Sequence, residues 1–431
     1  MLDINFVRKN RDVVEAAIRN KGCEADLDGV LKLDEGRKEL GQKIDELRRE
    51  RNEIANKMKN GKPEQALIDR GKQIKMELMK YEGDLDGVER DYLRELKLVP
   101  NVPWADVPVG LSEEENVVSE VVGEPTKFEF EAKNHYEIGV ARGWIDKERA
   151  AKVAGARFAY VKGEMVKLQM AMMSFVIDAL TDEATLKEIC EKYDMKVQPK
   201  PFVPVLPPYM IRTELYDAMD RLEPREDRYK VEGEELWLQG SAEHVLGSMH
   251  ADEVFAAEDL PVRYLGYATS FRQEAGTYGK DMEGIIRLHQ FDKLEMESFT
   301  AGEDGLSEHL FFVAIQRWLM DKLELPYRVL AKCTWDIGKP NARGIDIEAW
   351  LPGQGKYRET HTADYMTDYQ ARRLNTRCKR GDKMEFVHTN DATAFALGRA
   401  MVAIIENYQT AEGQVRVPEV LKKYLGGREV L

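Results

Sequence analysis

The sequence predicts an α+β protein: an antiparallel β-sheet core flanked by helices, preceded by an N-terminal antiparallel α-helical coiled-coil arm. Three observations support this prediction. Apolar residues at heptad spacing run through residues 37–98 on both sides of a turn signal. Further along the chain, strand-like runs flank glycine-containing loops, which is typical of antiparallel hairpins. Apolar stripes at helical spacing between these runs predict helices that cover the sheet.

The composition fits a folded protein of two or three domains. The chain has 431 residues, of which 43% are hydrophobic, enough for a sizeable core and too many for wholesale disorder. No apolar run approaches the roughly 20 residues of a membrane span, and the first residues contain no apolar signal region. We therefore expect a cytoplasmic protein with no membrane contact. The four cysteines are scattered without CxxC pairing, which argues against a disulfide scaffold and against a cysteine-clustered zinc site.

The arm is predicted from a heptad seam with one turn in it. The seam residues of the first leg are Leu40, Ile44, Leu47, Ile54 and Met58, and those of the second are Leu67, Gly71, Ile74, Leu78, Tyr81, Leu85, Val88 and Tyr92. Between the legs, Asn60-Gly61-Lys62-Pro63 ends one helix and begins the next. The two legs therefore fold back on each other over about residues 37–98, each reaching roughly 35 to 50 Å at 1.5 Å per residue.

The charge of this arm differs from that of the rest of the chain. The whole sequence has a net charge of −14, which on its own argues against a nucleic-acid partner. Residues 37–80, however, contain 13 basic and 8 acidic residues, a local charge of +5, which leaves −19 elsewhere. A basic arm on an acidic body suits contact with an RNA backbone. A solvated coiled coil that only dimerises remains the alternative on this segment alone.

A proline-rich stretch marks the predicted domain boundary. LVPNVPWADVPVG, residues 98–110, contains three prolines and cannot continue a helix. We accordingly expect an N-terminal domain at 1–104 and a second domain at 105–431. Residues 111–140 are acidic and poor in pattern, which suits an extended linker or edge structure. Residues 166–193 predict one long, mostly buried helix, and the strand-like FVPVLPPYMI that follows predicts an edge or subunit contact because of its prolines.

Charged residues stand inside strand-like sequence in the second domain. In residues 267–300, alternation places Arg272 and Glu274 on one face of the first run, and places Arg287, His289, Phe291, Lys293 and Glu295 on one face of the second. Such charges are costly if buried without partners, so they suggest a site, although a solvated face with salt bridges is the plainer alternative. Residues 345–373 show the same feature. The last such region, 386–409, predicts a strand, a polar turn and a helix with Arg399 in its first turns, where an arginine suits an anion or a carboxylate partner.

Taken together, these motifs resemble those of the seryl-tRNA synthetases, a class II aminoacyl-tRNA synthetase family, essentially end to end. The resemblance rests on five pieces in the family's order. They are the heptad arm with its VPNVPWADVPVG exit, AAKVAGARFAYVKGE (150–164), VLPPYMI (205–211), FRQE with RLHQFDKLE, and ALGRAMVAIIENYQ (396–409).

This resemblance implies a ligase that activates L-serine with ATP to seryl-adenylate and transfers the seryl group to the 3′ end of tRNA(Ser), with tRNA(Sec) left open as a second acceptor. It also implies a homodimer formed through the first class motif, a class II catalytic domain at 105–431, a tRNA-binding domain at 1–104, and Mg²⁺ as the metal. Because the cysteines do not cluster with His or Glu, we expect no zinc. In the arm, Arg48, Arg49 and Arg51 are the expected tRNA-binding residues.

For the nucleotide, the resemblance implies that Arg272 bridges the α-phosphate and the substrate carboxylate, as suits a planar bidentate donor. Glu274 would hydrogen-bond the adenine amino group, Phe291 would stack on the adenine, and Arg399 would clamp its other side. Glu359 and Thr362 would hold Mg²⁺, whose hard character favours oxygen ligands. The expected catalytic residues are Arg272, Glu359 and Arg399. The remaining expected ATP-binding residues are Gln273, Arg287, Leu288, Thr360 and His361.

For serine, the resemblance implies Glu295 and Thr393 near the hydroxyl, and Ser241, Ala242 and Glu243 in the loop that engages the amino group, with Arg272 at the carboxylate. A pocket that hydrogen-bonds a hydroxyl can reject alanine, because its own polar groups would be left unpaired.

Three departures from the family pattern stand out. Ser241 replaces threonine, Asp391 stands where the family has asparagine, and residues 333–344 are shorter and more basic, so no role is assigned there. The extra carboxylate of Asp391 would tune amino-group binding, raise a local pKa, or mark a paralogue with another substrate. Two alternatives remain on the sequence alone: a paralogue that activates another small amino acid, and a protein that binds RNA without charging it.

Overall fold

The computed structural model describes residues 1–59, 64–275 and 284–431. The described chain forms two compact units, Met1–Val102 and Pro103–Leu431. Within these residues no helix is both long enough and apolar enough to cross a membrane.

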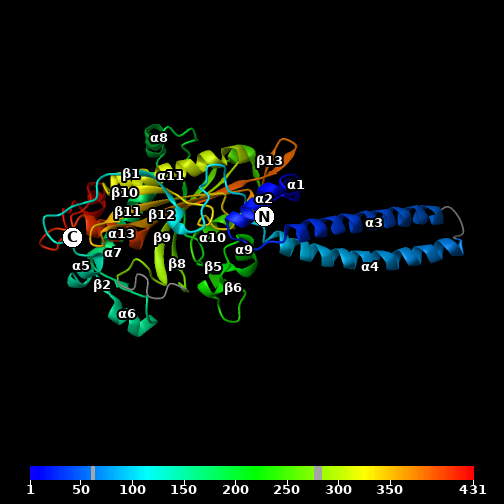
Figure 1. Ribbon diagram of the computed structural model, residues 1–431, viewed down its shortest axis with the longest axis horizontal. Helices are drawn as coiled ribbons and strands as arrows, with labels where there is room; N and C mark the ends of the chain where they lie inside the picture. The colour runs from blue at the N-terminus through cyan, green and yellow to red at the C-terminus, as the bar shows by residue number, and fades with distance from the viewer. Residues whose placement is uncertain (60–63, 276–283) are drawn as a thin grey trace. The chain divides into compact units, whose positions relative to one another are not determined.

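The first unit is helical. Two short helices, α1 (Ile4–Lys9) and α2 (Arg11–Asn20), precede the long helices α3 (Leu27–Lys59) and α4 (Gln65–Leu96), which lie side by side as a hairpin (Figure 1). Apolar side chains of both legs are buried between them, confirming the predicted coiled coil; they are Ile44, Leu47, Ile54, Ile74 and Leu78. The predicted turn at 60–63 lies outside the described residues.

The predicted start of the hairpin near residue 37 is wrong, because α3 begins at Leu27. The heptad pattern fails there at Asp34, whose side chain is fully buried. This carboxylate is paired with Arg8 and with Arg37, the latter at 2.7 Å. A buried ionic contact thus replaces an apolar one, and a search for apolar periodicity does not detect it.

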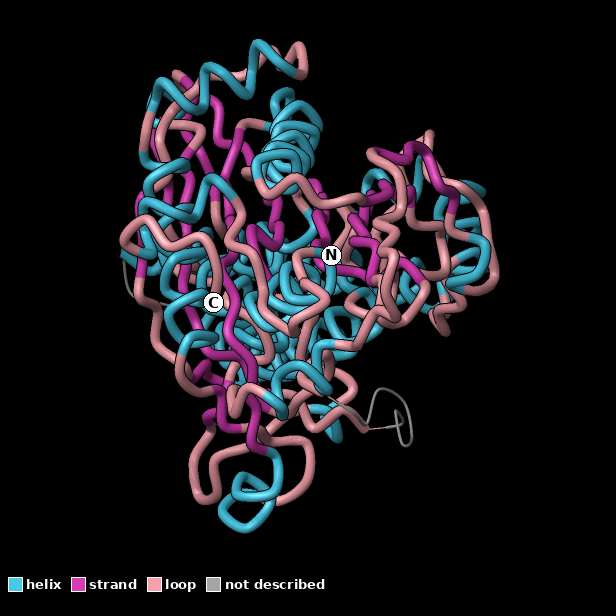
Figure 2. The backbone as a smooth tube through the Cα atoms, turned by 90° about the vertical axis from the view of Figure 1, so that its left-hand side faces the viewer, coloured by secondary structure: helices cyan, strands magenta, loops and turns pink. Residues whose placement is uncertain are grey.

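The second unit is built on one large sheet. Its eight strands have the order β1-β10-β11-β12-β15-β9-β8-β4, and all neighbours are antiparallel except β4 and β8. Figure 2 shows these strands in magenta beside the cyan helices. The strands are β1 (Val117–Val122), β4 (Val203–Val205), β8 (Val262–Phe271), β9 (Gln290–Thr300), β10 (Tyr327–Ala331), β11 (Arg343–Leu351), β12 (Lys356–Thr367) and β15 (His388–Ala396).

Smaller strand groups and short helices surround this sheet. The strand groups are β2 (Ile145–Asp146) with β3 (Tyr160–Val161), β5 (Met210–Arg212) with β6 (Leu236–Leu238), and β7 (Val254–Ala256) with β13 (Arg377–Arg380) and β14 (Lys383–Phe386). The helices are α5 (His135–Ala141), α6 (Lys147–Ala154), α7 (Glu164–Thr181), α8 (Glu183–Lys192), α9 (Thr213–Ala218), α10 (Glu243–Gly247), α11 (Gly305–Lys322), α12 (Tyr369–Leu374), α13 (Leu397–Asn407) and α14 (Glu419–Lys422).

The main core lies where α7, α11 and α13 pack on the sheet. Apolar strand residues on the face toward these helices are fully buried; they include Leu294, Met296, Ala363, Ala392 and Phe395. Because side chains alternate along a strand, most of the polar residues between them point to the opposite face. The predicted α+β fold is therefore confirmed, and its polar sheet face is left to form a site.

Some predicted elements differ in the structure. The single helix at 166–193 is two helices, because Asp182 caps α8 by accepting a hydrogen bond from the amide of Thr185 at 2.9 Å. Residues 111–140 contain the edge strand β1, as expected, but also the start of α5. The proline-containing β4 lies at the other edge of the sheet, as its composition predicts.

Two strand assignments near the motifs are corrected. The predicted polar turn before the last helix is absent, since β15 runs unbroken from His388 to Ala396 and leads directly into α13. Two of its polar residues, Asp391 and Thr393, line a cavity instead of forming a turn. In the hairpin of β8 and β9, β8 ends at Phe271 and β9 begins at Gln290, so Arg272, Glu274, Arg287 and His289 lie outside the strands and simple alternation does not describe them.

Candidate active site

A cavity of about 270 Å³ opens on the polar face of the sheet. Its walls come from β9, β12 and β15, from the segments next to β8 and β9, and from the starts of α10 and α13. Thirteen of the predicted site residues line it. They are Glu243, Arg272, Glu274, Arg287, Leu288, Phe291, Glu295, Glu359, Thr360, Thr362, Asp391, Thr393 and Arg399.

Four predicted residues do not line the cavity. Gln273 is exposed and donates to the carbonyl of Arg228 at 2.8 Å. His361 is fully buried on the core face, where its ring nitrogen lies 2.8 Å from the hydroxyl of Thr360. Ser241 and Ala242 are fully buried behind the wall, although the Ser241 hydroxyl accepts a hydrogen bond from the cavity residue Lys293 at 2.9 Å.

At one end of the cavity, cationic side chains lie near an aromatic ring. The guanidinium of Arg272 is 5.3 Å from the centre of the Phe291 ring and is fixed by a hydrogen bond from its Nε to the carbonyl of Gly240 at 2.9 Å. Arg287 is ion-paired with Glu274, whose backbone adopts a left-handed φ of 55°. This end therefore combines fixed positive charge with a flat apolar surface, a combination suited to a nucleotide.

A β-bulge sets the direction of two oxygen-bearing side chains. Glu359 and Thr362 are three residues apart and would face opposite sides of a regular strand, yet both line the cavity. The register between β11 and β12 shifts at Thr360, where one extra residue is accommodated. Glu359 in turn accepts a hydrogen bond from Arg399 at 2.9 Å, which joins the strand to the first turn of α13.

Lys332 reaches the cavity over a glycine. A side chain at Gly344 would lie 2.9 Å from both the Lys332 Cδ and an oxygen of Asp364, so the absence of a side chain there makes room for the lysine. The lysine ammonium lies 3.8 Å from Asp346, which accepts a hydrogen bond from Thr362. Lys332 thus adds positive charge next to Glu359 and Thr362.

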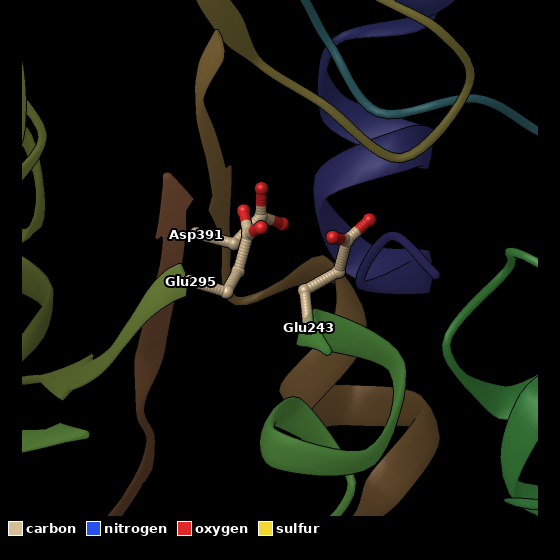
Figure 3. A group of neighbouring side chains, drawn as sticks. All are labelled: Glu243, Glu295 and Asp391. Carbon is tan, nitrogen blue, oxygen red and sulfur yellow. The ribbon is translucent and has the colours of Figure 1, made fainter. Parts of the chain in front are cut away.

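The opposite end of the cavity is acidic. Oxygens of Glu243, Glu295 and Asp391 lie within 4.8 Å of one another, and Figure 3 shows the three carboxylates, from α10, β9 and β15, turned toward one another. Lys293 lies beside them, 2.6 Å from Glu295 and 4.0 Å from Glu243. Thr393 donates to Glu295 at 3.4 Å. Burial raises the pKa of Glu295 to about 7 in spite of the lysine.

Behind this end, acidic residues form a row across three neighbouring strands. Asp364 of β12 pairs in register with Asp391 of β15, which pairs with Glu297 of β9. The guanidinium of Arg221 lies 3.5 Å from Asp391 and 3.9 Å from Asp364. Burial, together with the neighbouring carboxylates, raises the pKa values of Asp391 and Glu297 well above the ordinary range.

Several residues in the cavity wall or next to it were not assigned from the sequence. Lys293 shares the alternation of Phe291 and Glu295, a signal that could have identified it. Acidic residues inside the strand-like run 345–373 pointed toward Asp346 and Asp364, without giving their positions. Arg221 and Lys332 gave no usable signal, since one lies in a loop after α9 and the other at the end of β10.

In the first unit, the three arginines expected to bind tRNA lie on α3 and are exposed. Arg48 donates to Glu82 of α4 at 2.9 Å, which holds it against the hairpin.

Comparison with known proteins places this architecture. A model of the seryl-tRNA synthetase N-terminal domain matches residues 1–103, and a model of the class II tRNA synthetase core domain (G, H, P, S and T) matches residues 228–408. A serine–tRNA ligase of Nitrosopumilus maritimus is 36% identical over 436 residues, covering 100% of both chains. The chain belongs to the serine–tRNA ligase family.

Solved structures of this family superimpose along the whole chain. The seryl-tRNA synthetase of Pyrococcus horikoshii complexed with ATP has a TM-score of 0.88 at 36% identity and covers 100% of this chain and 99% of its own. The cytoplasmic serine–tRNA ligase of Naegleria fowleri in complex with AMP has a TM-score of 0.84 at 27% identity and covers 100% of this chain and 98% of its own. The family resemblance and the fold expected from the sequence are thereby confirmed.

Proposed function

We propose that this protein activates L-serine with ATP and transfers the seryl group to tRNA(Ser). The observation that carries the proposal is full-length membership of the serine–tRNA ligase family together with a cavity that gathers thirteen of the expected site residues. Relatives with this name over the whole chain do not favour a paralogue with another activity. Transfer to tRNA(Sec) stays an open extension.

The first step joins serine to the α-phosphate. A carboxylate oxygen of serine attacks the α-phosphorus, the bond from that phosphorus to the pyrophosphate oxygen breaks, and pyrophosphate leaves with the electron pair. Arg272, held by Gly240, would bridge the carboxylate and the α-phosphate and so align the reacting atoms. Phe291 would stack on the adenine, while Glu274 would accept a hydrogen bond from its amino group and Arg287 would contact phosphate.

The oxygens of Glu359 and Thr362 fit Mg²⁺, which takes hard oxygen ligands. Glu359 keeps 47% of its side chain exposed and so remains accessible from the cavity. When bound, the ion would neutralise charge on the phosphates. Arg399, already hydrogen-bonded to Glu359, would cover the adenine from the side opposite Phe291.

The acidic end of the cavity would hold serine itself. Glu243 would bind the α-ammonium group, and Glu295 and Thr393 would bind the hydroxyl. Ser241 acts indirectly in this scheme, because its hydroxyl is fixed to Lys293. In the second step, a terminal ribose hydroxyl of tRNA attacks the carbonyl carbon of the adenylate and AMP leaves.

The remaining parts of the proposal concern the assembly. The basic hairpin, through Arg48, Arg49 and Arg51, would contact the tRNA backbone, with residues 1–104 as the tRNA-binding domain and 105–431 as the catalytic domain. A homodimer is supported by apolar residues exposed on and between β4 and β5, among them Val203, Leu206 and Met210, of which Leu206 is 81% exposed. A cytoplasmic location follows, since charged tRNA is used where proteins are made.

The test is serine-dependent exchange of pyrophosphate into ATP, followed by charging of tRNA(Ser). We expect both activities in the wild-type protein, and we expect Arg272→Ala to lower exchange by about a hundredfold or more, the usual effect of removing one donor to a developing charge. Arg272→Lys, which keeps the charge but not the bidentate geometry, is the matched control and should restore only part of the activity. Absence of exchange with serine in the wild-type protein would refute the proposal.

A further inference from the structure

The acidic end of the cavity contains more carboxyl groups than serine can engage. Three carboxylates, Glu243, Glu295 and Asp391, converge there, and Glu297 and Asp364 stand next to Asp391 in the sheet. Among the described residues, Arg221 and Lys293 make ion pairs with this group, and the ring of His244 lies 3.4 Å from Glu243. Serine carries one ammonium group and a neutral hydroxyl, so carboxyl groups remain in this end of the cavity that a second ammonium group on the amino acid would engage.

Asp391 brings to the cavity wall a buried carboxylate oxygen without a hydrogen-bond donor among the described residues. It is 3% exposed and lines the cavity. Its Oδ2 accepts no hydrogen bond within the part of the chain that the structure describes. The Arg221 guanidinium, at 3.5 Å, instead donates a hydrogen bond to Asn341 at 3.0 Å. A buried carboxylate oxygen without a donor is costly, and a donor supplied by a ligand would remove that cost.

The chemistry of the surroundings selects an organic ammonium rather than a metal ion. The Lys293 ammonium already lies 2.6 Å from Glu295, so a divalent ion held by the three carboxylates would be placed against another cation. An ammonium group donates up to three hydrogen bonds and carries a single charge, and the oxygens of Asp391 and Glu295, within 4.8 Å of each other, are close enough for one such group to bond both.

We propose that this pocket also accepts small α-amino acids whose β-substituent is a second ammonium group, with L-2,3-diaminopropionate as the type, and that Asp391 is the residue that selects them. This inference rests on the proposed function. The β-ammonium group replaces the serine hydroxyl at nearly the same size, so the pocket walls need not move. Activation forms and breaks the same bonds as with serine. A carboxylate oxygen attacks the α-phosphorus, pyrophosphate leaves, and no further reactant is needed.

The first experiment compares isosteric amino acids on the wild-type protein. Pyrophosphate exchange is measured with L-serine, L-2,3-diaminopropionate and L-2-aminobutyrate, which place a hydroxyl, an ammonium and a methyl group at the same position. We expect exchange with diaminopropionate at a kcat/KM about tenfold or more above that with aminobutyrate, because only the former pairs with the carboxylates. Equal values for the two, or no exchange with diaminopropionate, would overturn the inference.

The second experiment uses Asp391→Asn, which keeps the shape and removes the charge. The ratio of kcat/KM for diaminopropionate to kcat/KM for serine should fall about tenfold or more relative to the wild type. An unchanged ratio would assign the selection to another residue and overturn the role of Asp391. If the variant does not fold, the isostere comparison on the wild-type protein still decides whether the pocket accepts the diamine.

Failure of this inference is distinguishable from failure of the proposed function. Exchange with serine but not with diaminopropionate refutes the inference alone. Absence of exchange with every amino acid refutes the proposed function.

Discussion

The hairpin and the cavity each contain a glutamate beside a cation, and the two glutamates behave differently. In the hairpin, Arg70 donates to Glu50 at 2.7 Å, with 36% and 39% of the two side chains exposed, and this hydrogen bond lowers the pKa of Glu50. In the cavity, Lys293 lies 2.6 Å from Glu295, with 10% and 2% exposed, yet burial raises the pKa of Glu295 to about 7. The two glutamates lie at nearly the same distance from their cations, so it is access to water that decides whether the pKa of the glutamate is lowered or raised.

The comparison explains where each region is sensitive to mutation. Ion pairs on the hairpin are screened by water and contribute little to folding, so arginines such as Arg48 can exchange their present partners for another at a small cost in stability. In the cavity the pKa of each charged group depends on the charges of its neighbours. Replacing one charged residue by a neutral one therefore shifts the pKa values of the others.

The largest effect is expected at the end of the cavity where phosphates would bind. Glu359→Gln should lower serine-dependent exchange about a hundredfold and raise the Mg²⁺ concentration needed for half-maximal rate, because a neutral amide is a poor ligand for a hard cation. Exchange measured across a Mg²⁺ series checks this. Glu348→Gln is the matched control, since Glu348 pairs in register with Glu359 but is ion-paired with Arg328 away from the cavity. Equal losses in the two variants would contradict a metal-binding role.

The next effect concerns the stability of the hairpin. Ile74 is fully buried between α3 and α4, so Ile74→Ala should destabilise the first unit by about 2 to 4 kcal/mol through lost burial and a cavity. The free energy of unfolding of the first unit is measured by denaturant titration, with hydrogen exchange of the hairpin amides as the probe. Arg70→Ala, which removes the exposed pair, should change stability little. A larger loss from Arg70→Ala than from Ile74→Ala would reverse the contrast between the two kinds of contact.

A smaller, selective effect is expected from the arm's charges. Neutralising Arg48, Arg49 and Arg51 together should leave exchange intact and lower kcat/KM for charging about ten- to a hundredfold, with a weaker salt dependence, since phosphate contacts release counterions. The control neutralises three exposed lysines of the other unit, Lys127, Lys196 and Lys379, and so changes the net charge equally. Normal charging by the arm variant would exclude the arm as the tRNA-binding element.

The smallest effect is a pH dependence of serine binding. In the proposed scheme, ionised Glu295 would accept a hydrogen bond from the serine hydroxyl, so KM for serine should rise about tenfold from pH 8 to pH 6 as the carboxyl group takes up a proton near pH 7. The groups around it are Lys293, Glu243, Asp391 and Arg272. Glu295→Gln should give a flat profile, and an equally steep profile in that variant would assign the titration to another group.

The same shift has a defined sign for folding. The folded pKa of Glu295 lies above its ordinary 4.5, so the folded state binds the proton more tightly than the unfolded state. The resulting stabilisation is complete below pH 4.5 and is lost as the pH rises through 7. Relative to Glu295→Gln, the wild-type protein should therefore lose stability between pH 5 and pH 8 in denaturant unfolding.

Much of the fold and of the site could be predicted from the sequence because the signals were local. Heptad spacing in α3 and α4, and alternation in β9, follow from the periodicity of each element. The resemblance supplied the motif residues at the cavity. The bulge at Thr360 could not be predicted, because it depends on register with β11. Neither could the strand through Asp391, because polar residues that face a cavity look like a turn when neighbouring strands are unknown.

Residues that reach the cavity across the chain were also missed, for a related reason. Lys332 reaches the cavity over Gly344, and Arg221 lies beside the cavity residue Asp391 from a loop, so their positions depend on contacts between distant segments. The periodicity of apolar residues along one element does not predict contacts between distant segments. Asp34 hid the first turns of α3 for a different reason, because this buried charge, paired with Arg8 and Arg37, interrupts the apolar heptad pattern.

The paired carboxylates of Asp391 and Glu297 have a consequence for calorimetry. With pKa values raised well above the ordinary range, they hold protons more tightly than ordinary carboxyl groups. A cationic ligand that settles beside them favours release of those protons to the solution. The heat of binding measured for an amino acid should therefore vary with the ionisation enthalpy of the buffer, and the slope of that variation counts the protons released.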